Sequence, residues 1–357
     1  MDITMQNDLM KKTTVLCSLF VAAAMGIMLY YCANKIAIVA DLAQDEVVQA
    51  AENKSDHAAM EEGNRIKIDR DSGKTNYFCV PVPPDVRVEE VTVENHYMDR
   101  ELWVSIEPEK MSGQESFYES NGVYGSCEAV VDGRFEVEKE RLCLRFRLTD
   151  VFEYRSIFED NTLYIEFVPP KEVYDKIIVI DPAYGEEDTG TVTDTVSAKD
   201  ITLNIAKALK AKLDETDIKV YYTRMDDSNP EAGYRVRLAE STKADMLIRI
   251  EVGSDKSSKK YGTETVYNSQ FFIPGFGSVE LADLLEREVV TAISGKAVGL
   301  VEAGETDTVI SEATVPAAAV KVGYLTNGQE AILLQREDYI QRIAEGIYQA
   351  ILKAYAE

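Results

Sequence analysis

Histidine is almost absent from this chain, with 2 in 357 residues, at His57 and His96. No imidazole follows residue 96, so the rest of the chain must carry out any chemistry without one. This excludes metal sites built from several histidines, and imidazole acid-base catalysis, from that part of the protein.

Basic residues are also scarce. The chain has 38 Lys and Arg against 63 Asp and Glu, a formal net charge of −25. Nucleic-acid binding requires clustered positive charge to neutralise phosphates, so this balance argues against a nucleic-acid partner. The excess of acidic residues favours solubility and does not by itself indicate a substrate.

Cysteine is limited to 5 residues, none in a C-x-x-C spacing, which excludes zinc-ribbon and dithiol redox sites. Three of them, Cys79, Cys127 and Cys143, lie outside the one long apolar run. A disulfide between Cys127 and Cys143 and buried free thiols are both compatible with the sequence.

The long apolar run covers residues 13–33 and contains no charge, the length that spans a bilayer core. Lys11 and Lys12 precede it, which places residues 1–12 in the cytoplasm. A cleaved signal peptide has a shorter apolar region of about 7–15 residues. We therefore predict an uncleaved, single-pass anchor in the cell membrane, with the later domains extracytoplasmic.

Two different patterns follow the apolar run. Residues 34–75 are predicted to form a helical stalk and a charged, Gly-containing linker. Residues 76–170 alternate polar and apolar side chains in short runs, which predicts a small antiparallel β domain with Trp103 in its core. Pro169 and Pro170 end the last of these runs.

From residue 173 to 357 strand-like and helix-like patterns alternate, which predicts an α/β three-layer sandwich with a mostly parallel sheet. Ligands bind such sheets at the carboxyl ends of the strands. We expect strands at 176–180, 219–224, 245–252, 262–268 and 315–325, and helices at 200–216, 231–244, 278–294 and 339–354.

Ordered blocks over about residues 176–355 resemble the zinc-dependent N-acetylmuramoyl-L-alanine amidases, which cut between the lactyl group of muramic acid and the first L-alanine of the peptidoglycan stem peptide. The resemblance implies the fold of that family. The blocks are IDPAYGEEDTG, SAKDITLNIAKALKAKL, VYYTR, AESTKAD, IRIEVGS, YGTETVYN and VPAAAVKVGYLTNGQEAILL.

The same resemblance implies a degenerate catalytic site. In chain order, the family's three zinc ligands are a His, a Glu and a His, which correspond to Tyr184, Ala198 and Glu251 here, and its general base, a Glu, corresponds to Lys321. Three ligands and an open position are what a catalytic zinc needs to activate water. We therefore predict no zinc cofactor, no catalytic residues and a pseudoenzyme, although enzymatic activity stays uncertain.

The residues present at this site predict a pocket, and their roles in it have several possible interpretations. Lys321 is hypothesised to pair with Glu251 in place of the metal, and Tyr184 either fills the vacated space or offers a stacking surface. An all-oxygen site for Mg²⁺, Ca²⁺ or Mn²⁺, built from the acidic loop and Glu251, is a minor alternative. The candidate pocket residues are Asp181, Tyr184, Glu186, Asp188, Glu251, Lys321 and Asn327.

The predicted function is a binding or regulatory module of cell-wall remodelling, with peptidoglycan stem peptides or a wall-remodelling protein as its partner. The alternative is an active N-acetylmuramoyl-L-alanine amidase that uses a non-standard site. A purely structural role is a third reading. Fold resemblance cannot choose among these, because function resides in the site.

Overall fold

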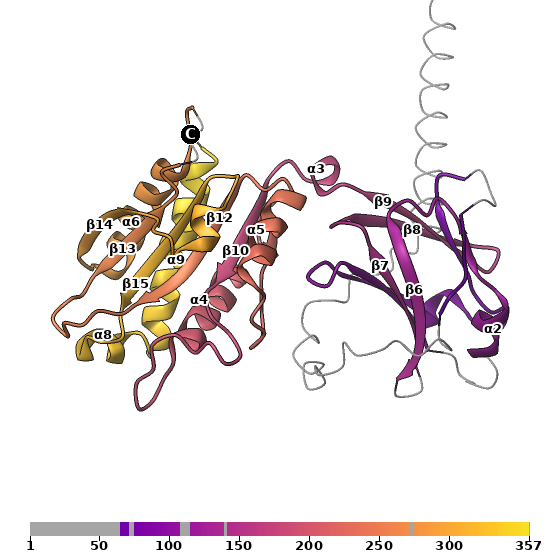
Figure 1. Ribbon diagram of the computed structural model, residues 1–357, viewed down its shortest axis with the longest axis horizontal. Coiled ribbons are helices and arrows are strands. Elements are labelled where there is room, and N and C mark those ends of the chain that lie inside the picture. The colour runs from indigo at the N-terminus through magenta and orange to yellow at the C-terminus, as the bar shows by residue number, and fades with distance from the viewer. Residues whose placement is uncertain (1–64, 71–74, 108–114, 139–140, 271–273, 357) are drawn as a thin grey trace, which may run out of the picture.

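The computed structural model describes residues 65–70, 75–107, 115–138, 141–270 and 274–356, which form a β unit and an α/β unit (Figure 1). The predicted cytoplasmic segment 1–12, the anchor 13–33 and most of the stalk 34–75 lie outside the described residues. Within the predicted linker, a two-residue strand forms, β1 (Ile68–Asp69).

The β unit packs two sheets face to face. One sheet has the strand order β1-β5-β2-β9-β8 and the other the order β3-β4-β7-β6. Apart from the parallel pair β1–β5, neighbouring strands are antiparallel, as predicted. The strands are β2 (Phe78–Pro81), β3 (Val91–His96), β4 (Glu101–Ile106), β5 (Val123–Gly125), β6 (Val130–Glu138), β7 (Arg141–Leu148), β8 (Glu153–Glu159) and β9 (Thr162–Val168).

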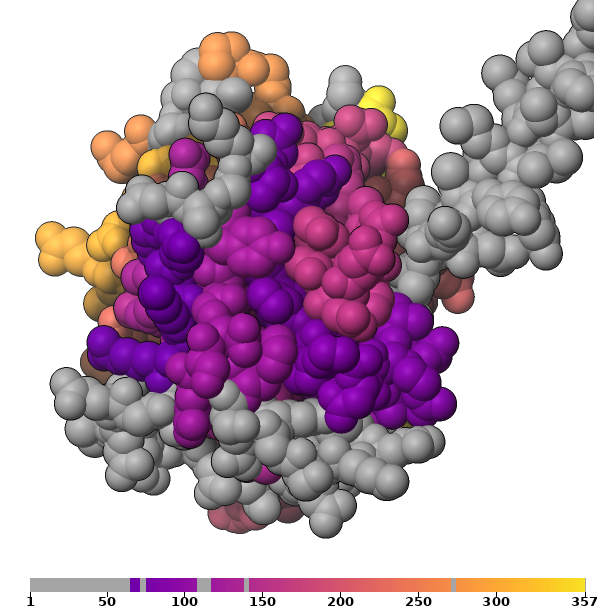
Figure 2. All heavy atoms as spheres, turned by 90° about the vertical axis from the view of Figure 1, so that its right-hand side faces the viewer, coloured from indigo at the N-terminus to yellow at the C-terminus, as the bar shows by residue number. Residues whose placement is uncertain are grey.

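Period-two alternation decides which side chains form the core of the β unit. Leu102 and Val104 of β4 are buried between the sheets, so Trp103 between them points the other way. Trp103 is half-buried, stacked on His96 with Arg145 over its ring. The prediction that Trp103 is a core residue is therefore wrong. Figure 2 shows this unit facing the viewer, with earlier residues (indigo) beside later ones (magenta).

The α/β unit contains one six-stranded sheet of order β11-β10-β12-β15-β13-β14. Only β13 runs antiparallel to its neighbour β15, so the sheet is mostly parallel, as predicted. Its strands are β10 (Ile177–Pro182), β11 (Lys219–Tyr222), β12 (Met246–Gly253), β13 (Thr263–Tyr267), β14 (Ala297–Glu302) and β15 (Ala317–Tyr324).

Helices cover both faces of this sheet. One apolar core joins the sheet to α4 (Ala198–Leu213), α6 (Ser278–Ile293) and α9 (Glu337–Ala354). A second joins the opposite face to α5 (Ala232–Ser241) and α7 (Thr308–Ser311). The predicted three-layer α/β architecture is confirmed (Figure 1). The short elements β14, α7 and α8 (Gly328–Leu333) are not among the predicted ones.

The predicted location in the cell membrane is corrected. Within the described ranges, no helix combines the length and the apolar composition needed to cross a bilayer. Even α9, with 18 residues, is apolar on one face only, and its charged residues face away from the core.

The three described cysteines, Cys79, Cys127 and Cys143, are buried, and none of them forms a disulfide. Of the two readings left open by the sequence, the structure therefore favours buried thiols over a Cys127–Cys143 disulfide. Burial raises the pKa of both Cys79 and Cys127, which keeps these thiols protonated and unreactive.

Candidate functional site

The candidate site lies at the carboxyl ends of β10, β12 and β15, where the sequence predicted it. The loop after β10 turns sharply: Tyr184 has φ +69° and Gly185 has φ +140°. A Cβ atom on Gly185 would lie 2.1 Å from the carbonyl oxygen of Ser228, so only glycine fits there. This turn brings the Tyr184 ring back over the end of the sheet.

Asp181, at the end of β10, is completely buried and held by two arginines. The Arg235 and Arg249 guanidinium groups each contact its carboxylate, and the Thr223 hydroxyl donates to it at 2.5 Å. Burial by itself raises the pKa of Asp181, but the charges of Arg249 and Arg235 outweigh it and hold that pKa well below its usual range. Asp181 is thus a structural anion beneath the site.

Arg249 links this buried anion to Glu251, two residues further along β12. Its Nε lies 2.7 Å from Oε1 of Glu251, while its Nη1 contacts Asp181. Residues two apart on a strand point to the same face, which lets Arg249 reach Glu251, and Asp181 is the Cα partner of Arg249 on the neighbouring strand β10. The carboxylate expected to face a metal therefore faces an internal cation.

Lys321 does not pair with Glu251, so the hypothesis of that ion pair is wrong. The two residues are Cα partners across β12 and β15, but the Lys321 ammonium lies 3.6 Å from Oε1 of Glu264 on the other side. Glu264 is also bound by Lys260 at 2.8 Å. Burial by itself raises the pKa of Glu264, but Lys260 and Lys321 outweigh it and lower that pKa below its usual value. This carboxylate therefore stays ionised.

Tyr184 occupies space beside Ala198. Its hydroxyl donates to the backbone oxygen of Val252 at 3.2 Å, and its ring packs against Gly190. A Cβ atom on Gly190 would lie 2.8 Å from the Ala198 Cβ and 2.9 Å from the Tyr184 ring. Burial, and then the nearby Glu251, raise the pKa of Tyr184, so its phenol stays neutral. This packing supports the reading of Tyr184 as a filler.

A cavity of about 240 Å³ opens above these groups. Three predicted residues line it: Tyr184, Glu251 and Lys321. It is also lined by four polar side chains that sequence reasoning missed, Ser254, Glu264, Asp307 and Tyr324. The one sequence signal for Glu264 is its position in the block YGTETVYN, whereas its antiparallel pairing with Lys321 is visible only in the structure.

The other predicted pocket residues do not line this cavity. Asp181 lies beneath it, and Glu186 and Asp188 are exposed in the loop after β10. Asn327 begins helix α8, where its side chain accepts hydrogen bonds from the amides of Gln329 and Glu330 at 3.1 and 3.2 Å. Of the predicted residues, some therefore line the cavity, Asp181 supports it from below, and Asn327 caps a helix.

The residues that the sequence resemblance matches to the family's zinc ligands do not fit zinc in this structure. Ala198 has no side-chain atom that could bind a metal. The Tyr184 hydroxyl donates to the backbone oxygen of Val252, and Glu251 is paired with Arg249. Throughout the described part of the chain, no group of three His, Cys, Asp or Glu side chains is placed to hold a metal ion. The Arg249 guanidinium and the Lys321 ammonium would also repel a second cation here.

Comparison with known proteins agrees with the sequence resemblance. A family model described as N-acetylmuramoyl-L-alanine amidase matches residues 178–353. The uncharacterized protein YqiI of Bacillus subtilis is 30% identical over 180 residues, 50% of this chain and 85% of that protein. The germination-specific N-acetylmuramoyl-L-alanine amidase of B. subtilis is 29% identical over 223 residues, 58% of this chain and 90% of that one.

Among solved structures, an N-acetylmuramoyl-L-alanine amidase from Clostridium difficile 630 is 32% identical, with 51% of this chain and 97% of that chain covered and a TM-score of 0.48. The CwlD amidase from Clostridioides difficile, solved in complex with the GerS lipoprotein, is 26% identical, covering 51% of this chain and 98% of that chain with a TM-score of 0.43. On the family-model match and the aligned identity, this chain belongs to the N-acetylmuramoyl-L-alanine amidase family.

Proposed function

We propose that this protein is a non-hydrolytic member of its family that binds peptidoglycan stem peptides and regulates cell-wall remodelling. One observation carries the proposal. The Arg249 guanidinium bridges Asp181 and Glu251, so an internal cation neutralises the carboxylates at the position where the family places its metal. The site keeps a charge balance without an ion that could activate water.

The cavity above Arg249 has the chemistry of a peptide-binding pocket. Its wall offers carboxylates at Glu251, Glu264 and Asp307 and an ammonium at Lys321. The Lys321 side chain is 21% exposed and its contact with Glu264 is long, at 3.6 Å, so the ammonium is free to turn toward a ligand carboxylate. Peptides with both amine and carboxylate groups match such a mixed-charge wall.

A protein ligand is the second class of partner for this proposal. The CwlD amidase of C. difficile has been solved with the GerS lipoprotein, which shows that one relative assembles with another protein. An active amidase with a non-standard site is the competing function, since the cavity remains open and contains ionised groups.

One experiment separates binding from hydrolysis. The full chain is incubated with purified cell-wall sacculi, and the bound protein, the released stem peptides and the zinc content are measured together. We expect co-sedimentation with no peptide release. Changing Lys321→Met should lower the bound fraction by roughly tenfold, the effect of losing one partly buried ion pair.

The matched control is Lys259→Met, which removes an exposed lysine that does not line the cavity and should leave co-sedimentation unchanged. Metal-dependent release of stem peptides by the unaltered chain would contradict the proposal and establish the competing amidase function. Loss of sacculus binding in both variants alike would show that binding reflects bulk charge only.

A further inference from the structure

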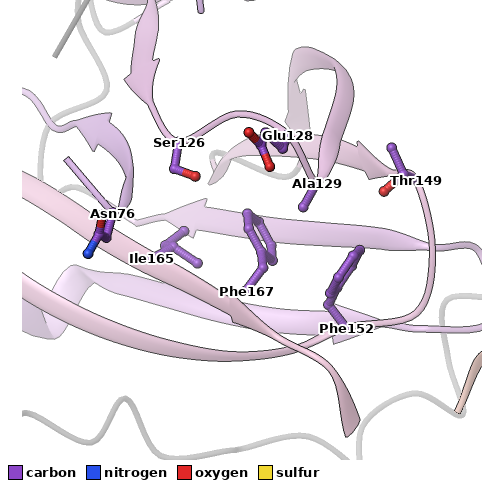
Figure 3. Close-up of a pocket in the computed structure, with 8 residues that line it drawn as sticks. All are labelled: Asn76, Ser126, Glu128, Ala129, Thr149, Phe152, Ile165 and Phe167. Atoms are coloured by element: carbon purple, nitrogen blue, oxygen red, sulfur yellow. The ribbon is translucent and has the colours of Figure 1, made fainter. Parts of the chain in front are cut away.

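A second cavity lies in the β unit, far along the chain from the residues of the first. Its volume is about 250 Å³, and it opens at one end of the two packed sheets. Figure 3 shows Ser126, Glu128 and Ala129 on one side of it and Ile165, Phe167 and Phe152 on the other. Asn76 and Thr149 complete the lining. No residue of the α/β unit lines it.

One wall of this cavity is aromatic and rigidly held. The rings of Phe152 and Phe167 lie 6.0 Å apart at 61°, and Phe167 packs against the fully buried Phe78 at 5.8 Å. The backbone of Phe152 accepts a hydrogen bond from the Asn95 side chain at 2.8 Å. Both phenylalanines remain half-buried, so part of each ring faces the cavity.

The opposite wall carries a carboxylate without an ion pair among the described residues, Glu128. The neighbouring cation, Arg70, is committed elsewhere, because it donates to the backbone oxygens of Cys127, Val130 and Val131 at 2.8–3.0 Å. These bonds also fix the segment that presents Glu128. The cavity therefore has a preformed anionic side.

Both walls favour the same kind of ligand. Ring faces attract cations within about 6 Å of their centroid, and an unpaired carboxylate does so more strongly. The hydroxyls of Ser126 and Thr149 and the amide of Asn76 supply further acceptors for N–H groups. A net charge of −25 raises the local concentration of cations around the whole chain.

We propose that this cavity is a binding site for a primary ammonium group on a short carbon stem. The ammonium would lie between Glu128 and the two phenylalanines, and the stem would cover Ile165. A lysine-type side chain of a peptide and a free diamine share this chemistry. The site is independent of the function proposed for the α/β unit, so either can fail without the other.

The test is a titration of the ¹⁵N-labelled full chain, followed by amide chemical shifts at residues 126–129. Three probes are compared: Nα-acetyl-lysine methylamide, 1,5-diaminopentane and the neutral Nα-acetyl-norleucine methylamide. We expect saturable shifts with an ammonium probe and at least tenfold weaker binding of the neutral one, roughly the effect of a cation–π contact with an ion pair. The first probe identifies a peptide side chain as the source and the second a free diamine.

Two variants and a control locate the binding. Glu128→Gln should weaken ammonium binding roughly tenfold, and Thr149→Phe, which fills the cavity from an exposed position, should abolish it while leaving the carboxylate in place. Glu159→Gln makes the same charge change at an exposed residue outside the cavity and should have no effect. Equal binding of the neutral probe, or equal losses in Glu128→Gln and Glu159→Gln, would overturn the proposal.

Discussion

At the scale of single residues, the site depends on a completely buried carboxylate between two guanidinium groups. Asp181 contacts both Arg235 and Arg249, and each arginine also holds backbone or carboxylate oxygens of the site. Removing one partner of such a buried pair leaves an uncompensated charge, which costs more than the pair contributes. The stability of the site therefore depends strongly on Asp181, which is completely buried.

We predict that Asp181→Asn lowers the free energy of unfolding by about 3–5 kcal/mol, because two buried arginines lose their counter-ion. The pKa of Asp181 in the folded protein lies below the unfolded value of about 3.9. Its contribution is therefore present above that pH and is lost as the pH falls below about 4. Urea unfolding measured between pH 3 and pH 7 checks both effects.

The matched control for Asp181 is Glu187→Gln, an exposed carboxylate in the same loop. It should change stability little at any pH. If Asp181→Asn unfolds with the same free energy as the unaltered chain at pH 7, the two arginines do not depend on this carboxylate and the account of the buried network is wrong.

At the scale of elements, the short helix α8 begins at a polar side chain that accepts hydrogen bonds from its first backbone amides. This residue is Asn327, and its Nδ2 also donates to the backbone oxygen of Ser258 at 2.9 Å. It therefore joins the start of α8 to the loop after β12. This geometry supports a capping role in place of the pocket role that the sequence suggested.

We predict that Asn327→Ala lowers the free energy of unfolding by about 1 kcal/mol, the usual effect of losing a helix N-cap. Gln329→Ala, an exposed change in the same helix, should be nearly neutral. Thermal unfolding of the two variants measures the difference. Since Asn327 does not line the cavity, sacculus binding should persist in both, and its selective loss in Asn327→Ala would return Asn327 to the binding pocket.

At the scale of the whole molecule, the β unit and the α/β unit share a polar and aromatic contact. The ring of Tyr97 meets that of Tyr221 edge-on at 5.0 Å, and its hydroxyl accepts from the amide of Tyr222 at 3.1 Å. Glu153 is bound by Lys219 at 3.0 Å and by the Tyr221 hydroxyl at 2.5 Å. Burial lowers the pKa of Lys219, but Glu153 outweighs it and raises that pKa.

We predict that Glu153→Lys uncouples the two units, because it places a like charge against Lys219. The chain has 1 tryptophan, Trp103, so its fluorescence follows the β unit alone. Circular dichroism at 222 nm reports α4, α6 and α9 of the α/β unit. In urea the two signals should change together in the unaltered chain and separately in Glu153→Lys.

The exposed position Glu159 provides the control for this coupling. The variant Glu159→Lys carries the same charge change on the same strand, β8, and should keep the two transitions coincident. Coincident transitions in Glu153→Lys would show that the contact does not couple the units.

Much of the fold was predictable because its signals are local. The buried strands β10, β12 and β15 are mostly apolar, with their charged residues toward their carboxyl ends, and α4 and α9 repeat apolar residues at helical spacing. The missed strand β14 has neither signal: its side chains are mostly exposed at the sheet edge, and Gly299 interrupts it with φ +123°. The edge strand β14 forms because its backbone pairs with β13, and its own sequence pattern does not predict it.

The sequence alone determined which side chains follow the strands, and hence the position of the candidate site at the ends of β10, β12 and β15. It also determined that no histidine is available there, since none follows residue 96. Only the tertiary structure decided the pairing of charges: register puts Lys321 opposite both Glu251 and Glu264, and side-chain direction joins it to Glu264. Glu251 pairs with Arg249 and not with Lys321. The partner in an ion pair depends on the position of the charged end of a long, flexible side chain, and the local sequence pattern does not specify that position.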